Sequence, residues 1–125
     1  MTTETSQGME IGAQLVELCK QGKGMEAIQT LYHEDIVSVE AMPMPDGSRE
    51  MKGREAIIGK NEWWYANNEI HSFEATGPFP HGDRFIVNFT MDVTPKDGER
   101  MQMSEMGLYT VENGKIVREE FFYGM

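Results

Sequence analysis

The chain has 125 residues, enough for one domain with a single hydrophobic core. Its 21 acidic and 11 basic residues give a net charge of −10, which disfavours binding to nucleic acid or to an anionic membrane surface. One cysteine excludes an intramolecular disulfide, and no apolar run approaches the ~20 residues of a membrane span. We therefore expect a cytoplasmic protein whose single domain spans residues 1–125, with a loosely ordered polar tail over residues 1–8.

Three segments have the spacing of helices. Apolar residues recur three and four positions apart over residues 11–20, 25–32 and 53–68. Gly22 and Gly24 separate the first helix from the second. Two helices therefore precede the first strand, and a third follows it.

Three segments are typical of strands. Residues 35–42 and 70–76 are rich in β-branched and aromatic residues and end at proline or glycine, and Glu40 lies on the same side of the first strand as Ser38. Residues 83–94 alternate between apolar and polar side chains, which predicts a strand with one buried face. That face consists of Phe85, Val87, Phe89, Met91 and Val93.

The chain ends in a predicted hairpin over residues 99–123, with its turn at Asn113-Gly114. This dipeptide favours a type I′ turn, because both central residues need a positive φ. Glu105 is the carboxylate on a mostly apolar face of the first arm, which it shares with Met101, Met103, Gly107, Tyr109 and Val111. If residues 96–98 form a three-residue loop, Glu105 pairs with Phe89 on the buried side; an even-numbered loop turns it to the other face.

The outer face of this hairpin is predicted to be apolar. With a two-residue turn, the pairs on that face are Thr110 with Val117, Leu108 with Glu119, and Met106 with Phe121. Large exposed apolar patches usually mark contacts between molecules. We therefore expect a homodimer through the outer face of the sheet.

The element order is two helices, a strand, a helix and four strands, of which the last three are joined by tight turns. Segregated helices and antiparallel strands predict an α+β fold, in which a curved sheet wraps around the three helices. A half-cone of this kind leaves an apolar pocket between the sheet and the helices, where a hydrophobic small molecule can bind.

This order, with residues 32–40 (YHEDIVSVE), 53–57 (GREAI) and 111–117 (VENGKIV), resembles the NTF2-like superfamily. Within it, the chain is similar to the SnoaL-like polyketide cyclase and ketosteroid isomerase branch. The resemblance implies that Glu40 occupies the position of the isomerase's general base. The isomerase's tyrosine falls at Leu15 or Val16 and its protonated aspartate at Gly107, so both of its hydrogen-bond donors are missing. Glu105, two residues earlier on the same face, could supply a second carboxyl.

The resemblance implies a small enzyme of the isomerase or aldol-cyclase type, without a cofactor, that acts on a hydrophobic carbonyl compound. Glu40 would remove a proton next to the carbonyl, and Glu105 or Tyr109 would donate a hydrogen bond to the developing enolate. The alternative is a non-catalytic module that binds an apolar small molecule in the same pocket, because fold alone does not determine function.

The remaining candidates are lining and structural residues. Cys19 is expected to be a small buried residue. His71 is either a ligand contact or a hydrogen-bonded structural histidine. His33 and His81 lack the spacing of metal ligands, so no metal site is predicted. The residues expected to line the pocket are Trp63, Trp64, His71, Phe85, Phe89, Met91 and Met103.

Overall fold

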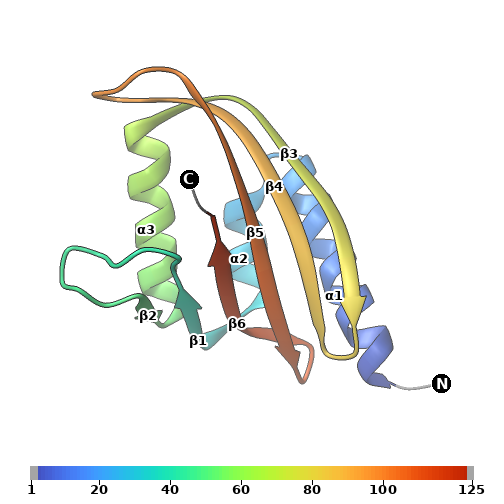
Figure 1. Ribbon diagram of the computed structural model, residues 1–125. Helices are drawn as coiled ribbons and strands as arrows, with labels where there is room; N and C mark the ends of the chain where they lie inside the picture. Colours follow the sequence, from blue (N-terminus) through green and yellow to red (C-terminus); the bar gives the residue numbers. More distant parts are fainter. Residues whose placement is uncertain (1–2, 124–125) are drawn as a thin grey trace.

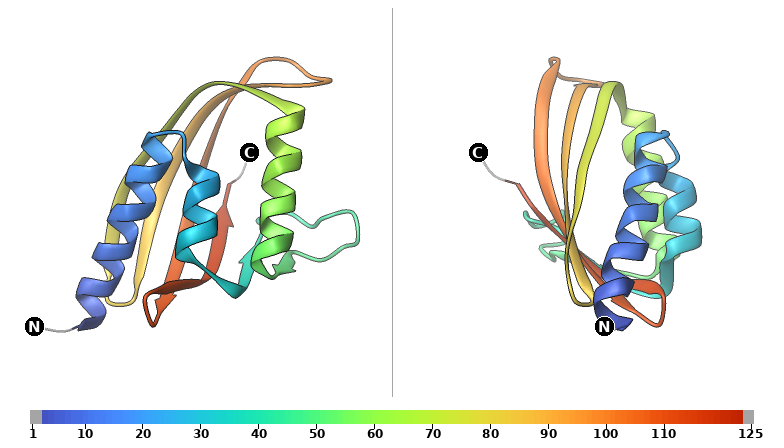
Figure 2. Two further views of the ribbon diagram at one scale, coloured as in Figure 1. Left: turned by 180° about the vertical axis from the view of Figure 1, so that it is seen from behind. Right: turned by 90° about the vertical axis from the view of Figure 1, so that its right-hand side faces the viewer.

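The computed structural model describes residues 3–123, which form three helices and one sheet of six strands (Figure 1). The elements are α1 (Thr3–Lys20), α2 (Gly24–Leu31), β1 (Tyr32–Val39), β2 (Glu50–Lys52), α3 (Arg54–Asn67), β3 (Asn68–His81), β4 (Arg84–Pro95), β5 (Met101–Glu112) and β6 (Lys115–Phe122). The strand order is β2-β1-β6-β5-β4-β3, and only β1 and β6 run parallel in this sheet of the described chain. All three helices lie against one face of the curved sheet (Figure 2), so the predicted α+β class is confirmed.

The core lies between the helices and the inner face of the sheet. The alternation in β4 is confirmed, since all five apolar residues of its predicted buried face are at most 6% exposed. From the helical side, the core receives Leu15 of α1, Ile28 of α2 and Ile57 of α3. The helical periodicity in the sequence therefore identified the faces that cover the sheet.

α1 begins at Thr3, within the segment that was predicted to be a loose tail; residues 1 and 2 lie outside the described part. Two glycines bring this helix close to the sheet. A Cβ on Gly8 would lie 2.6 Å from the carbonyl oxygen of Gly82, and one on Gly12 would lie 2.7 Å from the Cβ of Pro78. Because the helix contacts the sheet here without large apolar side chains, hydrophobic periodicity does not reveal its first turns.

Gly12 and Gly59 provide a matched pair for testing this close contact. In α3, a Cβ on Gly59 would meet nothing within 4 Å, so Gly59→Ala should stabilise the protein by up to ~1 kcal/mol through helix propensity. Gly12→Ala should instead destabilise it by ~1–3 kcal/mol, because the methyl group collides with Pro78 and the ring of Phe85. Urea unfolding followed by circular dichroism measures both. Equal changes in the two variants would show that α1 does not pack this closely.

Two strands differ from their predicted form. β3 does not end at Gly77 but continues through Pro78 and Pro80 to His81. Proline is tolerated here because β3 is an edge strand, where a missing N–H need not interrupt pairing with a second neighbour. The short strand β2 was not predicted, because its three residues are defined mainly by pairing with β1.

The loop between β4 and β5 is of the odd-numbered kind, and Phe89 pairs with Glu105. This confirms the alternative in which Glu105 lies on the inner face of the sheet. Side chains alternate along a strand, so the length of this loop decides which side of the sheet carries the carboxylate.

The turn at Asn113-Gly114 is confirmed, with φ values of 51° and 79°, but the predicted pairing beyond it is wrong. A register shift between Thr110 and Val111 leaves one extra residue in β6, and the observed pairs are Thr110 with Arg118, Tyr109 with Glu119, Leu108 with Glu120, and Met106 with Phe122. This β-bulge reverses the faces of the residues that follow it. Glu119 therefore lies inside the protein, and Phe122 takes the outer position predicted for Phe121.

The homodimer stays a prediction. On the outer face of the sheet, Phe122 now takes the place predicted for Phe121 opposite Met106. Met106 and Phe122 pair across β5 and β6, and they are 42% and 48% exposed. Static light scattering should report a dimer for the wild type, and Phe122→Glu should shift it toward monomer, because a charge cannot be buried unpaired in an apolar interface. A monomeric wild type at tens of micromolar would contradict this contact.

Candidate active site

A cavity of about 460 Å³ lies between the inner face of the sheet and the helices. Its volume falls in the range of ~300–1,000 Å³ that is typical of small-molecule sites. Its walls are largely apolar and aromatic, and they include Leu15, Ile28, Trp64, Ile70, Phe73, Phe89, Met91, Met103 and Phe121. A few polar groups stand among them, so the cavity can hold an apolar molecule and contact it with specific charged or hydrogen-bonding side chains.

Most of the predicted site residues meet at this cavity. The three proposed for chemistry, Glu40, Glu105 and Tyr109, all line it. They come from the end of β1 and from β5, two segments far apart in sequence. Four of the predicted lining residues also contribute to its wall, namely Trp64, Phe89, Met91 and Met103. Cys19 lines the cavity as well and is half-buried; burial raises the pKa of its thiol to about 11.

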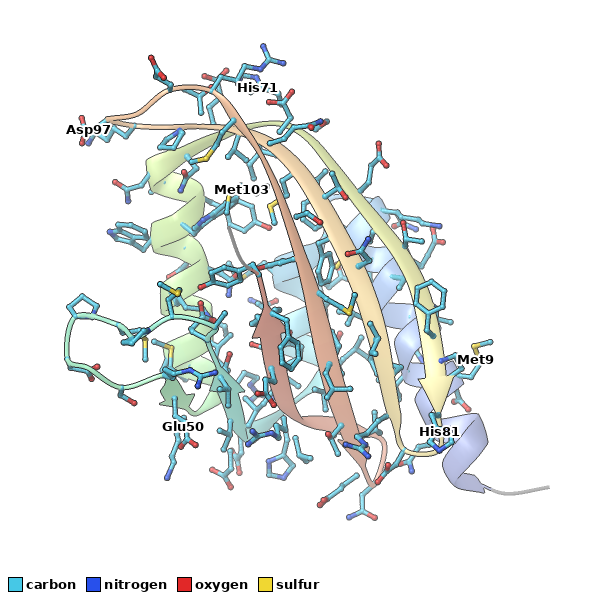
Figure 3. All side chains as sticks on the ribbon, in the orientation of Figure 1. Met9, Glu50, His71, His81, Asp97 and Met103 are labelled. Atoms are coloured by element: carbon cyan, nitrogen blue, oxygen red, sulfur yellow. The ribbon has the colours of Figure 1, made fainter. Side chains whose placement is uncertain are left out.

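Three predicted lining residues lie elsewhere. Trp63 is 64% exposed, because successive side chains of a helix point about 100° apart and its neighbour Trp64 faces the cavity. His71 lies beyond Met103 toward the end of the sheet (Figure 3), where its Nε2 is 2.8 Å from the Thr94 hydroxyl. It fits the structural alternative. Phe85 is buried in the core, where its ring stacks on Tyr109 with 5.0 Å between the ring centroids.

Glu40 forms an ion pair with Lys60 of α3. The Lys60 ammonium donates a hydrogen bond of 3.0 Å to Glu40 Oε2, and the two side chains are only 26% and 20% exposed. The same ammonium lies 5.6 Å from the centroid of the Phe121 ring, within range of a cation–π contact. Lys60 therefore compensates the negative charge on Glu40 at the cavity wall.

Glu105 is in a different environment. Burial among apolar side chains raises the pKa of its carboxyl from 4.5 to about 7; the negative charge of Glu40 adds to this, and Lys60 opposes it. Near neutral pH, Glu105 can therefore carry a proton that an exposed glutamate would have lost. The cavity wall thus holds two carboxyls in different surroundings, Glu40 paired with an ammonium and Glu105 among apolar side chains.

Tyr109 is fully buried apart from its contact with the cavity, and its ring lies across Gly107 of the same strand. A Cβ on Gly107 would stand 2.8 Å from ring atom Cε1 of Tyr109, so only glycine fits beneath this ring. Gly107 is the position at which the resemblance places the isomerase's aspartate. The aromatic ring of Tyr109 covers that position here.

Sequence reasoning missed Glu119 of β6. It lines the cavity, is 2% exposed, and accepts hydrogen bonds from the hydroxyl of Tyr32 and, at 2.7 Å, from that of Ser38. Burial raises the pKa of its carboxyl. The predicted register placed Glu119 on the outer face, and the β-bulge turns it inward. The only signal in the sequence was the loss of regular alternation along residues 117–122, which does not locate a bulge.

Residues 3–123 contain neither a metal-binding group nor a membrane-spanning helix. No group of three or more His, Cys, Asp and Glu side chains is arranged to hold a metal ion. No helix in this part of the chain is long and apolar enough to cross a membrane.

The chain is similar to several known proteins. Residues 5–123 match the SnoaL-like domain family. A crystal structure from Mesorhizobium loti, provisionally named a SnoaL-like polyketide cyclase, is 45% identical, with a TM-score of 0.86 over 91% of this chain and 97% of that one. No curated protein matches the chain.

More distant structures share the fold. A provisionally named isomerase from Bacillus subtilis is 17% identical, with a TM-score of 0.75 over 98% of this chain and 90% of that one. A protein with a ketosteroid isomerase-like fold from Catenulispora acidiphila, in complex with trimethylamine, is 21% identical, with a TM-score of 0.71 over 94% of this chain and 88% of that one. The match over nearly the whole chain shows that this protein is a member of the SnoaL-like domain family.

Proposed function

We propose that this protein catalyses proton transfer at the carbon next to a carbonyl group of an apolar small molecule. The observation that carries the proposal is the pair of carboxyls at one apolar cavity, Glu40 beside an ammonium and Glu105 among apolar side chains. Environments that favour opposite charge states in two titratable groups are typical of an acid and a base acting together. The provisional names of the relatives, cyclase and isomerase, agree with this chemistry.

In the proposed reaction, ionised Glu40 removes the proton from the carbon next to the carbonyl. Negative charge then develops on the carbonyl oxygen, and protonated Glu105 donates a hydrogen bond to it, with the hydroxyl of Tyr109 as a second possible donor. The proton held by Glu40 returns to another carbon in an isomerisation; in an aldol cyclisation the enolate attacks a second carbonyl, and the resulting alkoxide takes up that proton. Positioned proton transfer of this kind typically contributes ~10²–10⁴-fold to a rate.

Lys60 has a supporting role in this scheme. Its ammonium pairs with the Glu40 carboxylate in a largely apolar wall, where an unpaired carboxylate would be costly. Lys60 also opposes the rise in the pKa of Glu105 that burial and the charge of Glu40 produce. The aromatic walls bind the rest of the substrate and exclude water from the enolate.

The test is hydrogen–deuterium exchange of a bicyclic ketone, 1-tetralone, in D₂O, followed by proton NMR. The wild type should accelerate loss of the signal of the hydrogens next to the carbonyl. The enzymatic rate should fall as the pH rises through about 7, because Glu105 then loses the proton with which it donates. In Glu105→Gln this fall should disappear, since an amide donates at every pH. A wild-type rate that rises through pH 7 instead would make Glu105 the base and overturn the assignment of roles.

The second candidate function is binding without catalysis. The observation that favours it is the ion pair with Lys60, which already engages the carboxylate proposed as the base. A pure binding module would hold 1-tetralone without accelerating exchange at any pH. The same NMR samples distinguish the two functions. Transfer of saturation from the protein to the ketone signals reports binding, and it does so independently of exchange.

A further inference from the structure

Lys60 of α3 brings an amine to the cavity wall. It borders the cavity together with Glu40 and Phe121, and its side chain is 26% exposed. Of the lysines among residues 3–123, Lys20 is the other one that lines the cavity, but it is exposed and forms no ion pair within these residues. Lysines that react with carbonyl groups are typically held in apolar pockets of this kind.

The position of Lys60 on its helix is unusual. Ile57, Lys60 and Trp64 follow one another at spacings of three and four residues, which places them on one side of α3. Ile57 is fully buried in the core and Trp64 lines the cavity, so this side of the helix faces the sheet. An apolar residue would fill such a position at lower cost than a lysine. The charge of Lys60 therefore points to a chemical role and not to packing.

Two neighbours hold the nitrogen of Lys60 and stabilise positive charge on it. Glu40 Oε2 accepts a hydrogen bond of 3.0 Å from the ammonium, and the centroid of the Phe121 ring lies 5.6 Å from the nitrogen. The Phe121 ring is in turn held by an edge-to-face contact with Tyr109, with 6.3 Å between the ring centroids. These contacts require one N–H group and a positive charge, so they suit an iminium ion as well as an ammonium.

We propose that Lys60 forms an iminium ion with the carbonyl carbon of an apolar aldehyde or ketone bound in the cavity. The ammonium gives a proton to Glu40, and the free amine attacks the carbonyl carbon. Glu40 passes this proton to the carbonyl oxygen, and then a second proton from the nitrogen, so that the oxygen leaves as water. The C–O bond breaks as the C=N bond forms. A positive nitrogen faces a carboxylate before and after the reaction, so the net charge of the cavity does not change.

This inference deepens the proposed function and rests on it for one point, that the ligand carries a carbonyl group. An iminium carbon withdraws electrons more strongly than a neutral carbonyl carbon, so a base removes a hydrogen from the adjacent carbon more easily. The electrons of that C–H bond move to the nitrogen and give a neutral enamine. This route needs no hydrogen-bond donor to an oxygen, in agreement with the apolar residues and glycine, Leu15 or Val16 and Gly107, at the donor positions of the isomerase pattern.

Reductive trapping tests the inference with the wild-type protein and 2-tetralone, an apolar bicyclic ketone whose carbonyl group is not conjugated to its aromatic ring. Sodium cyanoborohydride transfers hydride to an iminium carbon and converts the adduct to a stable secondary amine. We expect the protein to gain the mass of one tetrahydronaphthyl group, located at Lys60 by mass spectrometry of its peptides. A label confined to other lysines, or no label, would overturn the proposal.

The background reaction is measured at Lys96, which is exposed in the loop between β4 and β5. Labelling of Lys60 should level off as the concentration of 2-tetralone rises, because it follows binding in the cavity, whereas labelling of Lys96 should rise in proportion. Lys60→Arg keeps the positive charge beside Glu40 but has no amine, and should lose the labelling that levels off. Lys20→Arg is the matched control and should retain the label at Lys60. Labelling of Lys60 in proportion to concentration, like that of Lys96, would overturn the proposal.

The two proposals can fail separately. If 1-tetralone exchanges its hydrogens but Lys60 is not trapped, the proposed function stands and this inference falls. If Lys60 is trapped with labelling that levels off but 1-tetralone does not exchange, the covalent site stands and the proposed proton transfer falls.

Discussion

Glu40→Gln is expected to slow exchange of the ketone hydrogens by ~10²–10⁴-fold while leaving the fold intact. Glutamine keeps the volume of the side chain and an oxygen that can accept the hydrogen bond from Lys60, but it cannot take up a proton from carbon. The rate of exchange in D₂O measures the loss. Thermal unfolding shows whether the variant is folded.

The control for this prediction is Glu62→Gln, which changes an exposed glutamate of α3, the helix that carries Lys60. It alters the net charge by the same amount and should leave the rate unchanged. In a pure binding module, Glu40→Gln would change the affinity for the ketone by no more than one hydrogen bond, ~0.5–3 kcal/mol, with no rate to lose. A Glu40→Gln protein that exchanges at the wild-type rate would remove Glu40 as the base.

Glu105→Gln is expected to stabilise the protein at high pH. The unfolded chain releases the Glu105 proton near pH 4.5, whereas the folded protein holds it until about pH 7. The favourable contribution of the protonated group is therefore complete below pH 4.5 and is lost as the pH rises to 7 and above. At pH 8 the difference between the two pKa values corresponds to on the order of 3 kcal/mol, which the neutral amide does not lose.

Urea unfolding at pH 4.5 and at pH 8 tests this prediction. The variant should gain stability relative to the wild type only at the higher pH. A gain of the same size at both pH values would show that packing, and not the charge of Glu105, limits stability. The predicted cost fits a carboxyl kept for chemistry, because sites that need unfavourable charges reduce stability.

Local patterns in the sequence determined the elements that carry the site. The alternation of residues 83–94 defined the buried face of β4, and Asn113-Gly114 defined the turn between β5 and β6. Both rest on interactions within a few residues, the side-chain period of a strand and the positive φ of a turn. The position of Glu40 at the cavity agrees with the place that the resemblance implied for the general base.

Other features depended on contacts between distant segments. The register that sets Glu105 opposite Phe89 was one of two alternatives in the sequence, and the odd-numbered loop of residues 96–100 between β4 and β5 fixes it. The ion pair of Glu40 with Lys60 joins residues 20 positions apart on a strand end and a helix. No pattern in the sequence around Glu40 or Lys60 indicates that the two side chains pair.

Glu119 shows most clearly what only the tertiary structure decided. No pattern in the sequence locates the extra residue in β6. It nevertheless moves every following side chain to the opposite face of the sheet. It places Glu119 against Tyr32 and Ser38, which lie 87 and 81 residues earlier in the chain. A β-bulge is chosen because the buried hydrogen bonds and packing that it permits outweigh the pairing it disrupts, and that balance exists only once the parallel strands β1 and β6 are side by side.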